Sequence, residues 1–230
     1  MRKILLGAGL SAATDANLGT LVAEAEAGGA DYIHIDATDT KRMCAIASNV
    51  GGPMMVGAIR KYTSLPIEVH ANIADLDERH IEAYAKVGAN MIVIPSEVYM
   101  GHRLGFMVSA AHKNGMKFGL TISPSGPPCL IENSIDLLDR VIIYARNAAT
   151  EEGGIYEPAM KSIKDLRRII DERHLNCVLC SDGAANVNTI GRLVEAGADC
   201  IEASRSIWNT GLSIADSIKQ LKDAIAVANK

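Results

Sequence analysis

The chain has 230 residues, of which 48% are hydrophobic and 22% charged, and its formal net charge is −4. This balance is typical of a globular protein and excludes a disordered chain. The weak negative charge, without a basic cluster that carries interleaved aromatic residues, gives no reason to expect a nucleic acid or a membrane surface as a partner. No apolar run reaches transmembrane length, and the first ten residues are too interrupted by glycine for a signal peptide.

The five cysteines are Cys44, Cys129, Cys177, Cys180 and Cys200. An odd and scattered set is typical of reduced thiols, so we expect a cytoplasmic protein. Cys177 and Cys180 form a C-x-x-C motif with no second pair. On a strand these two side chains point to opposite faces, so we interpret them as small core residues.

Short apolar runs alternate with amphipathic helical patterns along the whole chain. The predicted strands are Ile4–Leu10, Tyr32–Asp36, Pro66–His70, Met91–Pro95, Lys117–Ile122, Arg140–Tyr144, Cys177–Ser181 and Cys200–Ala203. The predicted helices include Leu18–Ala27, Glu78–Val87, His102–Asn114, Pro158–Arg173, Val187–Ala196 and Ile214–Val227. This alternation predicts a (β/α)8 TIM barrel. Because no linker or composition shift divides the chain, residues 1–230 are expected to form a single domain.

Three helix-to-strand connections share one sequence motif, in which glycine and alanine precede an aspartate or asparagine. They are Ala27–Asp31, Val87–Asn90 and Ala196–Asp199. Glycine there supplies the left-handed residue that ends a helix, and a parallel strand follows.

The strand Tyr32–Asp36 carries two metal-competent side chains two residues apart. Because strand side chains alternate between faces, His34 and Asp36 point to the same side. Catalytic groups of such barrels lie at the carboxyl ends of the strands, where His70 and Asp182 also stand. Two imidazoles and two carboxylates form a mixed ligand set suited to zinc, iron, cobalt or manganese. The sequence therefore predicts a site for one divalent metal ion.

Each of these side chains alone has a simpler interpretation. A lone histidine at a strand end is more often a hydrogen-bonded core residue. Asp182 with Gly183 could form a turn or a helix N-cap. The metal hypothesis depends on the four side chains standing together at one rim.

Seven segments carry a resemblance to a known family. They are Leu10-Ser11-Ala12, His34-Ile35-Asp36, the run from Arg60 to His70, Gly88-Ala89-Asn90, the run from Leu166 to Arg173, Ser181-Asp182-Gly183, and the run from Glu195 to Asp199. In these segments the chain resembles ribulose-phosphate 3-epimerases over nearly its full length.

The resemblance implies that His34, Asp36, His70 and Asp182 bind one divalent metal ion. It also implies that Asp36 and Asp182 are the acid and base of an isomerase. Such a metal-dependent 3-epimerase would act on a ketose phosphate, either ribulose 5-phosphate or a related pentulose or hexulose phosphate. The reaction removes the proton beside a ketone and returns it to the other face through a metal-stabilised enediolate. The resemblance further implies a homo-oligomer with a small-molecule sugar as its partner.

The substrate pocket departs from the family pattern. Family methionines near the metal correspond to Thr38, Asn72 and Tyr144, so an apolar wall becomes polar. The segment Thr38–Cys44 after the second strand and the loop Asn147–Ile155 after the sixth are rewritten. These differences bear on which sugar fits the pocket.

Groups after the last three strands could still bind a phosphate. Their backbone amides could cradle an anion, and Arg205 would add a fork of donors. Glu151 and Glu152 oppose a phosphate unless they point away, as in a solvated loop. The candidate substrate-binding residues are Ser11, Asn72, Tyr144, Asn147, Gly154, Gly183, Ala184, Ser204 and Arg205.

Three alternatives stay open. The same metal site could epimerise or isomerise an unphosphorylated or carboxylated sugar. A decarboxylase or aldolase of the same barrel superfamily is disfavoured, because the run from Glu68 to Ile73 lacks the lysine of their Asp-x-Lys-x-x-Asp signature. A non-catalytic relative is disfavoured by the four intact ligands.

Overall fold

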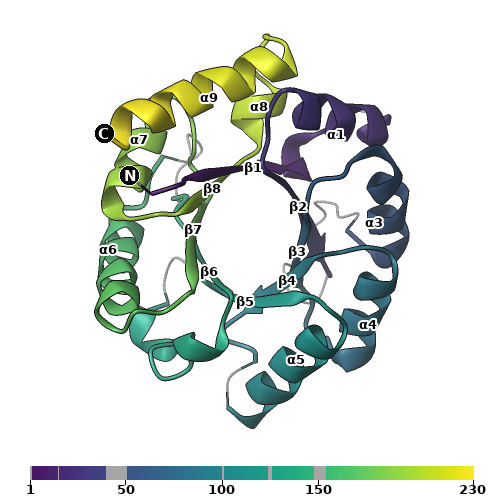
Figure 1. Cartoon of the computed structure of the whole chain (residues 1–230), viewed down its shortest axis with the longest axis vertical. Coiled ribbons are helices and arrows are strands. Elements are labelled where there is room, and N and C mark those ends of the chain that lie inside the picture. Colours follow the sequence, from purple (N-terminus) through teal and green to yellow (C-terminus); the bar gives the residue numbers. More distant parts are fainter. Residues whose placement is uncertain (1, 15, 40–50, 100, 124–125, 148–153) are drawn as a thin grey trace.

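A computed structural model describes residues 2–14, 16–39, 51–99, 101–123, 126–147 and 154–230. Eight parallel strands pair in sequence order and close into a barrel, which is ringed by helices (Figure 1). This architecture confirms the (β/α)8 barrel. The single domain spanning residues 1–230 stays a prediction.

The strands agree closely with their predicted bounds. They are β1 Leu5–Gly9, β2 Tyr32–Thr38, β3 Ile67–Asn72, β4 Met91–Pro95, β5 Lys117–Ile122, β6 Arg140–Tyr144, β7 Val178–Asp182 and β8 Cys200–Ala203. At their carboxyl ends β2, β3 and β7 run further than predicted. As a result Asp182 belongs to a strand, and its direction is set by the pleat rather than by a turn.

The six predicted helices are confirmed, with ends that shift by up to three residues. The helices are α1 Leu18–Ala27, α3 Pro53–Ile59, α4 Glu78–Lys86, α5 His102–Lys113, α6 Glu157–Glu172, α7 Ile190–Ala196, α8 Arg205–Trp208 and α9 Ile214–Ala228. Short 3₁₀ turns cover Leu10–Ala12, Arg60–Tyr62, Pro128–Leu130 and Ile135–Leu137. Across the described residues, every helix is too short or too polar to cross a membrane.

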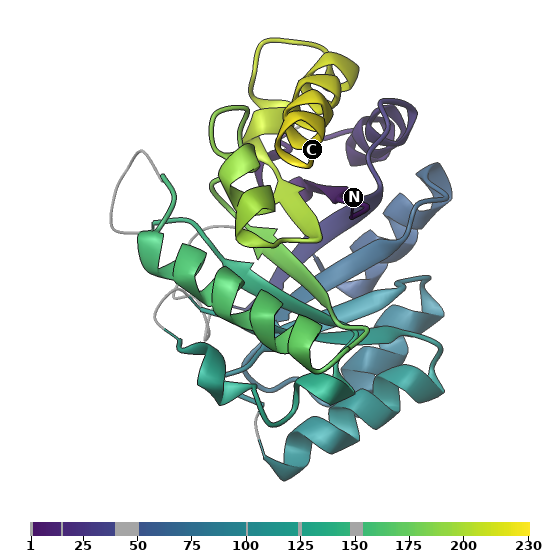
Figure 2. The same cartoon turned by 60° about the vertical axis from the view of Figure 1, so that its left-hand side comes forward.

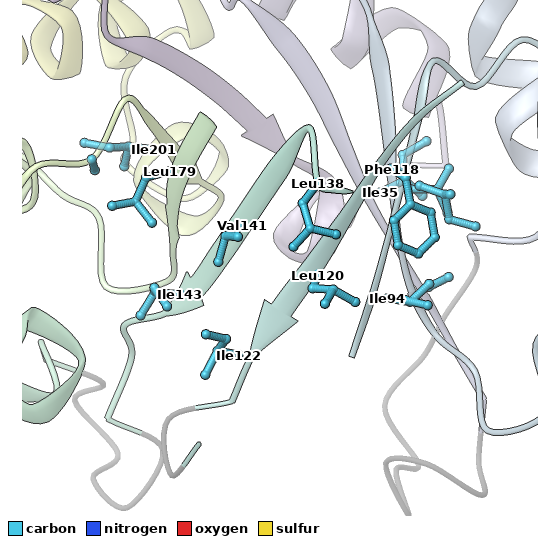
Figure 3. Packing of buried hydrophobic residues seen from close by; sticks show 14 of the residues in the cluster. Ile35, Ile94, Phe118, Leu120, Ile122, Leu138, Val141, Ile143, Leu179 and Ile201 are labelled. Carbon is cyan, nitrogen blue, oxygen red and sulfur yellow. The ribbon is translucent and has the colours of Figure 1, made fainter. Parts of the chain in front are cut away.

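The alternating faces of the strands build two separate cores. The outward side chains pack beneath the helices in one large cluster, part of which Figure 3 shows. Its labelled members are Ile35, Ile94, Phe118, Leu120, Ile122, Leu138, Val141, Ile143, Leu179 and Ile201. A smaller apolar cluster lies inside the barrel and consists of Tyr32, Met91, Val93, Ile142, Cys180 and Cys200. The barrel interior therefore leaves room for polar groups on the remaining inward positions.

The amino-terminal end of the barrel, which we call the base, is closed by side chains that bind strand backbone. The residue before every second strand accepts a hydrogen bond from an N–H of the preceding strand. These bonds join Asp31 to Leu6 (2.8 Å), Asn90 to Ile67 (2.8 Å), Asp139 to Phe118 (2.9 Å) and Asp199 to Leu179 (3.0 Å). The Asp or Asn of each Gly-Ala joint thus pins two neighbouring strands together.

The chain termini meet at this base. The amide of Asn229 donates a hydrogen bond of 2.7 Å to the Arg2 carbonyl. In both Figure 1 and Figure 2 the N and C labels lie close together. Figure 2 also shows the strands running obliquely behind the green helix α6.

Candidate active site

At the opposite end of the barrel, which we call the rim, β2 and β3 bring three polar side chains together. His34 and Asp36 are both inward positions of β2. In the register of the sheet Asp36 lies opposite His70 of β3. The pleat therefore aims all three into the barrel at its carboxyl-terminal end, as the period-two argument predicts.

The three side chains surround a common point. Oδ1 of Asp36 lies 3.6 Å from Nε2 of His34 and 3.4 Å from Nδ1 of His70. The imidazole centroids are 5.6 Å apart, and one ligand atom from each residue lies within 4.8 Å of the others. The two histidines are almost fully buried, whereas the Asp36 side chain keeps 22% of its surface exposed. The carboxylate is therefore the member of the group that a substrate can reach.

In each of the two imidazoles, one nitrogen contacts a neighbouring side chain, and the other makes no hydrogen bond with a described residue. Nδ1 of His34 contacts Glu68, and Nε2 of His70 contacts Thr121, each at 2.9 Å. The remaining nitrogens, Nε2 of His34 and Nδ1 of His70, are buried and have no hydrogen-bond partner among the described residues. A buried polar atom without a partner is costly, so these two nitrogens are suited to a ligand.

The spacing fits a metal ion. Two ligand atoms that each lie about 2.0–2.1 Å from a tetrahedral zinc ion are roughly 3.3 Å from one another. The separations of Asp36 from the two open nitrogens, 3.6 and 3.4 Å, are close to that value. The residues present could therefore hold a small divalent cation with little rearrangement.

Asp182 stands at the end of β7, where it lies opposite Tyr144 of β6 and Glu202 of β8. It does not join the compact group of three ligand atoms found among the described residues. It does lie within electrostatic range of that group. Burial raises the pKa of Asp182, the neighbouring His34 opposes that shift, and the nearby Asp36 carboxylate adds to it. The structure thus brings three of the four predicted ligands together and sets the fourth nearby.

The two rim carboxyls differ in their proton affinity. Burial acts to raise the pKa of Asp36, but its contacts with His34 and His70 outweigh burial and hold that pKa well below its usual range. The pKa of Asp182 is shifted the other way. Carboxyls whose environments separate their pKa values are suited to the roles of base and acid.

Sequence reasoning missed the charged groups behind His34. Glu68 and Glu202 are fully buried inward positions of β3 and β8. Glu68 accepts a hydrogen bond of 2.5 Å from Arg140, an inward position of β6 that is also buried. The available signal was a charged residue inside a short apolar run, because burying such a residue requires a partner.

Some of the predicted substrate-binding residues lie together at the rim. The hydroxyls of Ser11 and Ser204 are 3.1 Å apart, and the backbone N–H of Ala12 donates to Ser204 at 2.9 Å. Gly183 and Ala184 follow β7 with φ values of +81° and +60°. A left-handed conformation is unusual for alanine and is concentrated at functional sites.

The other predicted substrate-binding residues are spread around the rim. Asn72 pairs with Thr38 at the ends of β3 and β2, and the N–H of Asn147 donates to the Gly154 carbonyl at 2.8 Å. Tyr144 is half-buried at the end of β6. Arg205 is exposed at the start of α8, and it does not belong to the group formed by His34, Asp36 and His70. The rewritten positions 40–44 and 148–153, with Glu151 and Glu152, lie outside the described residues.

The chain matches the model of the Ribulose-phosphate 3 epimerase family over residues 5–208. A ribulose-phosphate 3-epimerase of Bacillus subtilis is 32% identical over 194 residues, which cover 84% of this chain and 87% of that protein. The Escherichia coli K12 ribulose-phosphate 3-epimerase is 29% identical over 210 residues, 91% of each chain. The chloroplastic enzyme of Arabidopsis thaliana is 29% identical over 219 residues, 95% of this chain and 76% of that one.

Solved structures with lower identity share the fold alone. A 3-hexulose-6-phosphate synthase aligns with a TM-score of 0.70 at 15% identity, covering 97% of this chain and 99% of that one. The orotidine 5′-monophosphate decarboxylase of Sulfolobus solfataricus aligns with a TM-score of 0.67 at 14% identity, over 100% of both chains. The family match, in contrast, spans residues 5–208, a range that includes His34, Asp36, His70 and Asp182. The chain belongs to the ribulose-phosphate 3-epimerase family, and with it to the isomerases that epimerise carbohydrates.

Proposed function

We propose that this chain is a divalent-metal-dependent 3-epimerase of a ketose phosphate. The observation that carries the proposal is a pair of buried imidazole nitrogens, Nε2 of His34 and Nδ1 of His70. They face one oxygen of Asp36, and no described residue forms a hydrogen bond with either of them. The family match independently supports epimerase chemistry.

The cation would be held by His34, Asp36 and His70, with Asp182 as the fourth ligand. Nitrogen and oxygen donors in this ratio suit zinc, iron, cobalt or manganese, and the residues do not choose among them. When bound, the ion supplies positive charge where the substrate carbonyl oxygen becomes negative. Both imidazoles are held from behind, so the donor atoms stay oriented before substrate enters.

Asp36 and Asp182 would move the proton. They come from β2 and β7, so they approach the centre of the barrel from different sides of the closed sheet. One carboxylate takes the proton beside the ketone, and the other returns a proton to the opposite face of the planar carbon.

The phosphate would bind on the β7 and β8 side of the rim. Gly183, Ala184 and Ser204 present backbone and hydroxyl groups there, and Ser11 lies against Ser204. Arg205 is exposed at the same side and would add a bidentate donor. Ribulose 5-phosphate and related pentulose or hexulose phosphates are the proposed substrates.

A second candidate is an unphosphorylated or carboxylated sugar on the same cation site. It is favoured by the polar Tyr144 and Asn72 at the rim, where family members carry methionine. A hydroxyl and an amide bind sugar hydroxyls better than a thioether does. A thermal-shift screen of matched sugars with and without phosphate separates the two candidates, because stabilisation follows affinity.

The cellular compartment and assembly state stay proposals. Cys129, Cys177, Cys180 and Cys200 are free thiols, which supports a reducing cytoplasm. A homo-oligomer is proposed from the family resemblance.

Proton exchange tests the proposal directly. In D₂O the cobalt- or zinc-loaded protein should introduce deuterium at the carbon beside the ketone of a ketose phosphate, as followed by NMR. Asp36→Asn and Asp182→Asn should each abolish this exchange while some metal stays bound, and Asp199→Asn at the base should exchange normally. Undiminished exchange in either rim variant would overturn the assignment of acid and base.

A further inference from the structure

The imidazole of His34 lies between two buried carboxylates. Its Nδ1 atom is 2.9 Å from Oε1 of Glu68 and 3.1 Å from Oε1 of Glu202. All three side chains are about 2% exposed or less. One N–H is therefore shared by two acceptors, on the side of the ring opposite to the proposed cation.

The two carboxylates are not equivalent. Glu68 is paired with Arg140, whose guanidinium lies 2.5 Å from Oε2 and also stacks 4.7 Å from the centroid of the Tyr32 ring. Among the described residues, no lysine or arginine forms an ion pair with Glu202. Besides the His34 contact, its Oε1 receives two longer contacts, 3.4 Å from the Tyr32 hydroxyl and 3.4 Å from the Cys180 thiol.

The second oxygen of Glu202 completes this contrast. Oε2 is buried and has no hydrogen-bond partner among the described residues. A buried carboxylate without a counter-charge is expensive, and replacement by an apolar residue would remove that cost. Glu202 lies closer to the His34 ring, at 3.1 Å, than to Tyr32 or Cys180, and this contact gives a physical reason for a glutamate at this position.

A carboxylate behind a metal-binding imidazole has two physical effects. It accepts the N–H and so fixes the tautomer and the plane of the ring. Its negative charge also strengthens the donation of the other ring nitrogen to a cation. Because Arg140 already pairs with Glu68, Glu202 is the member of the pair whose contact with His34 is free to act on the orientation of the ring.

We propose that Glu202 is a positioning residue for the cation site: by accepting the Nδ1–H of His34, it holds the Nε2 lone pair toward Asp36 and strengthens metal binding. This inference rests on the metal site of the proposed function. It assigns a role to a side chain that does not reach the rim and does not touch substrate.

An alternative interpretation is that His34, Glu68 and Glu202 together hold a second cation. One ligand atom each from His34, Glu68 and Glu202 lies within 4.8 Å of the others. Arg140 argues against this reading, because its guanidinium already occupies the charge-balancing position beside Glu68. The number of ions bound per chain distinguishes the two readings.

The test measures metal affinity in Glu202→Gln and Glu202→Leu. Glutamine keeps the shape and one acceptor oxygen but removes the charge, whereas leucine removes both. Zn²⁺ and Co²⁺ dissociation constants are obtained by competition with a chelator, and the visible absorption of bound Co²⁺ reports its coordination. Asp199→Asn is the matched control, because Asp199 precedes the same strand at the base. Thermal unfolding of the metal-free proteins checks that each variant is folded.

We expect one ion per chain in the wild type, with affinity weakened about tenfold by Gln and toward ~100-fold by Leu. The Co²⁺ spectrum should change in both variants, and Asp199→Asn should bind like the wild type. If the Glu202→Leu protein does not fold, the metal affinity and Co²⁺ spectrum of the isosteric Glu202→Gln protein test the inference.

Wild-type affinity and an unchanged Co²⁺ spectrum in a folded Glu202→Gln protein would overturn the inference and leave the proposed function standing. Two ions per wild-type chain would also overturn it, because the pair of carboxylates would then be ligands themselves. A wild-type chain that binds no divalent ion would overturn the proposed function and this inference together.

Discussion

The two ends of this barrel use polar side chains in opposite ways. At the base, Asp31 and Asp199 accept hydrogen bonds from strand N–H groups and also form ion pairs, Asp31 with Lys222 and Asp199 with Arg167. At the rim, by contrast, His34 and His70 each have one buried nitrogen that finds no hydrogen-bond partner in the described part of the chain.

This difference separates polar side chains that stabilise the fold from those that are suited to bind a ligand. A buried polar group whose partners lie within the protein contributes to stability. One that lacks a partner raises the energy of the metal-free protein until a ligand supplies the missing interaction. Variants at the two ends should accordingly change different observables.

The largest expected effect is at the rim. His70→Ala removes one open nitrogen, so Co²⁺ affinity should fall by more than the ~100-fold typical of groups that merely support a ligand. Competition titration with a chelator measures the change. The matched control is His112→Ala at the base, whose ring contacts Asp139 at 3.0 Å and is half exposed. Equal Co²⁺ affinities of His70→Ala and the wild type would show that the unpartnered nitrogen of His70 does not bind the metal.

At the base the expected effect is on stability. Asp199→Ala removes the acceptor of the Arg167 Nη1 group and of the Leu179 N–H, so the free energy of unfolding should fall by roughly 1–3 kcal/mol. Urea unfolding of the metal-free protein measures this loss, and Asp31→Ala should behave similarly. Metal affinity should not change in either variant. A base variant that weakens Co²⁺ binding while remaining folded would contradict the division between the two ends.

A smaller effect is expected behind the rim. Thr121 contacts the inner nitrogen of His70 at 2.9 Å, so Thr121→Val should weaken Co²⁺ binding by about tenfold through loss of ring orientation. Thr63→Val is the control, because Thr63 precedes β3 at the base and its hydroxyl accepts a local bond from the Leu65 N–H. If both variants bind Co²⁺ equally well, the hydroxyl of Thr121 has no role in holding the imidazole.

The smallest expected effect concerns a thiol at the base. Burial, followed by the charges of Asp139 and Asp199, raises the pKa of Cys177 to about 12 from an ordinary value near 9. The stability that this shift represents is present below pH 9 and is lost as the pH rises toward 12. At pH 8 the native protein should therefore leave Cys177 unalkylated while the exposed Cys129 reacts, as measured by mass spectrometry. Rapid alkylation of Cys177 would show that the base is open.

The fold was largely predictable from the sequence because the barrel repeats one local pattern. The bounds of β4, β5, β6, β8 and α1 agree with the predicted ones. The short helices α3 and α8 were not predicted, because α3 buries only Val56 and Ile59 and α8 only Ile207, too few apolar positions for a clear helical period. Pro53 at the start of α3 was the available signal.

The candidate site was predictable only in part. Alternation along β2 and β3 placed His34, Asp36 and His70 on inward positions, but it could not show which nitrogen stays open. That depends on Glu202 and Thr121, which come from strands far along the chain. Their contacts are set by barrel closure and register, and neither is a local property of the sequence.

One measurement tests the central claim most directly. Crystals of the cobalt-loaded protein, measured on both sides of the cobalt absorption edge, should show a single anomalous peak per chain about 2 Å from Nε2 of His34, Nδ1 of His70 and an Asp36 oxygen. A fully loaded crystal with no peak at that point, or with its cobalt bound elsewhere, would contradict the account.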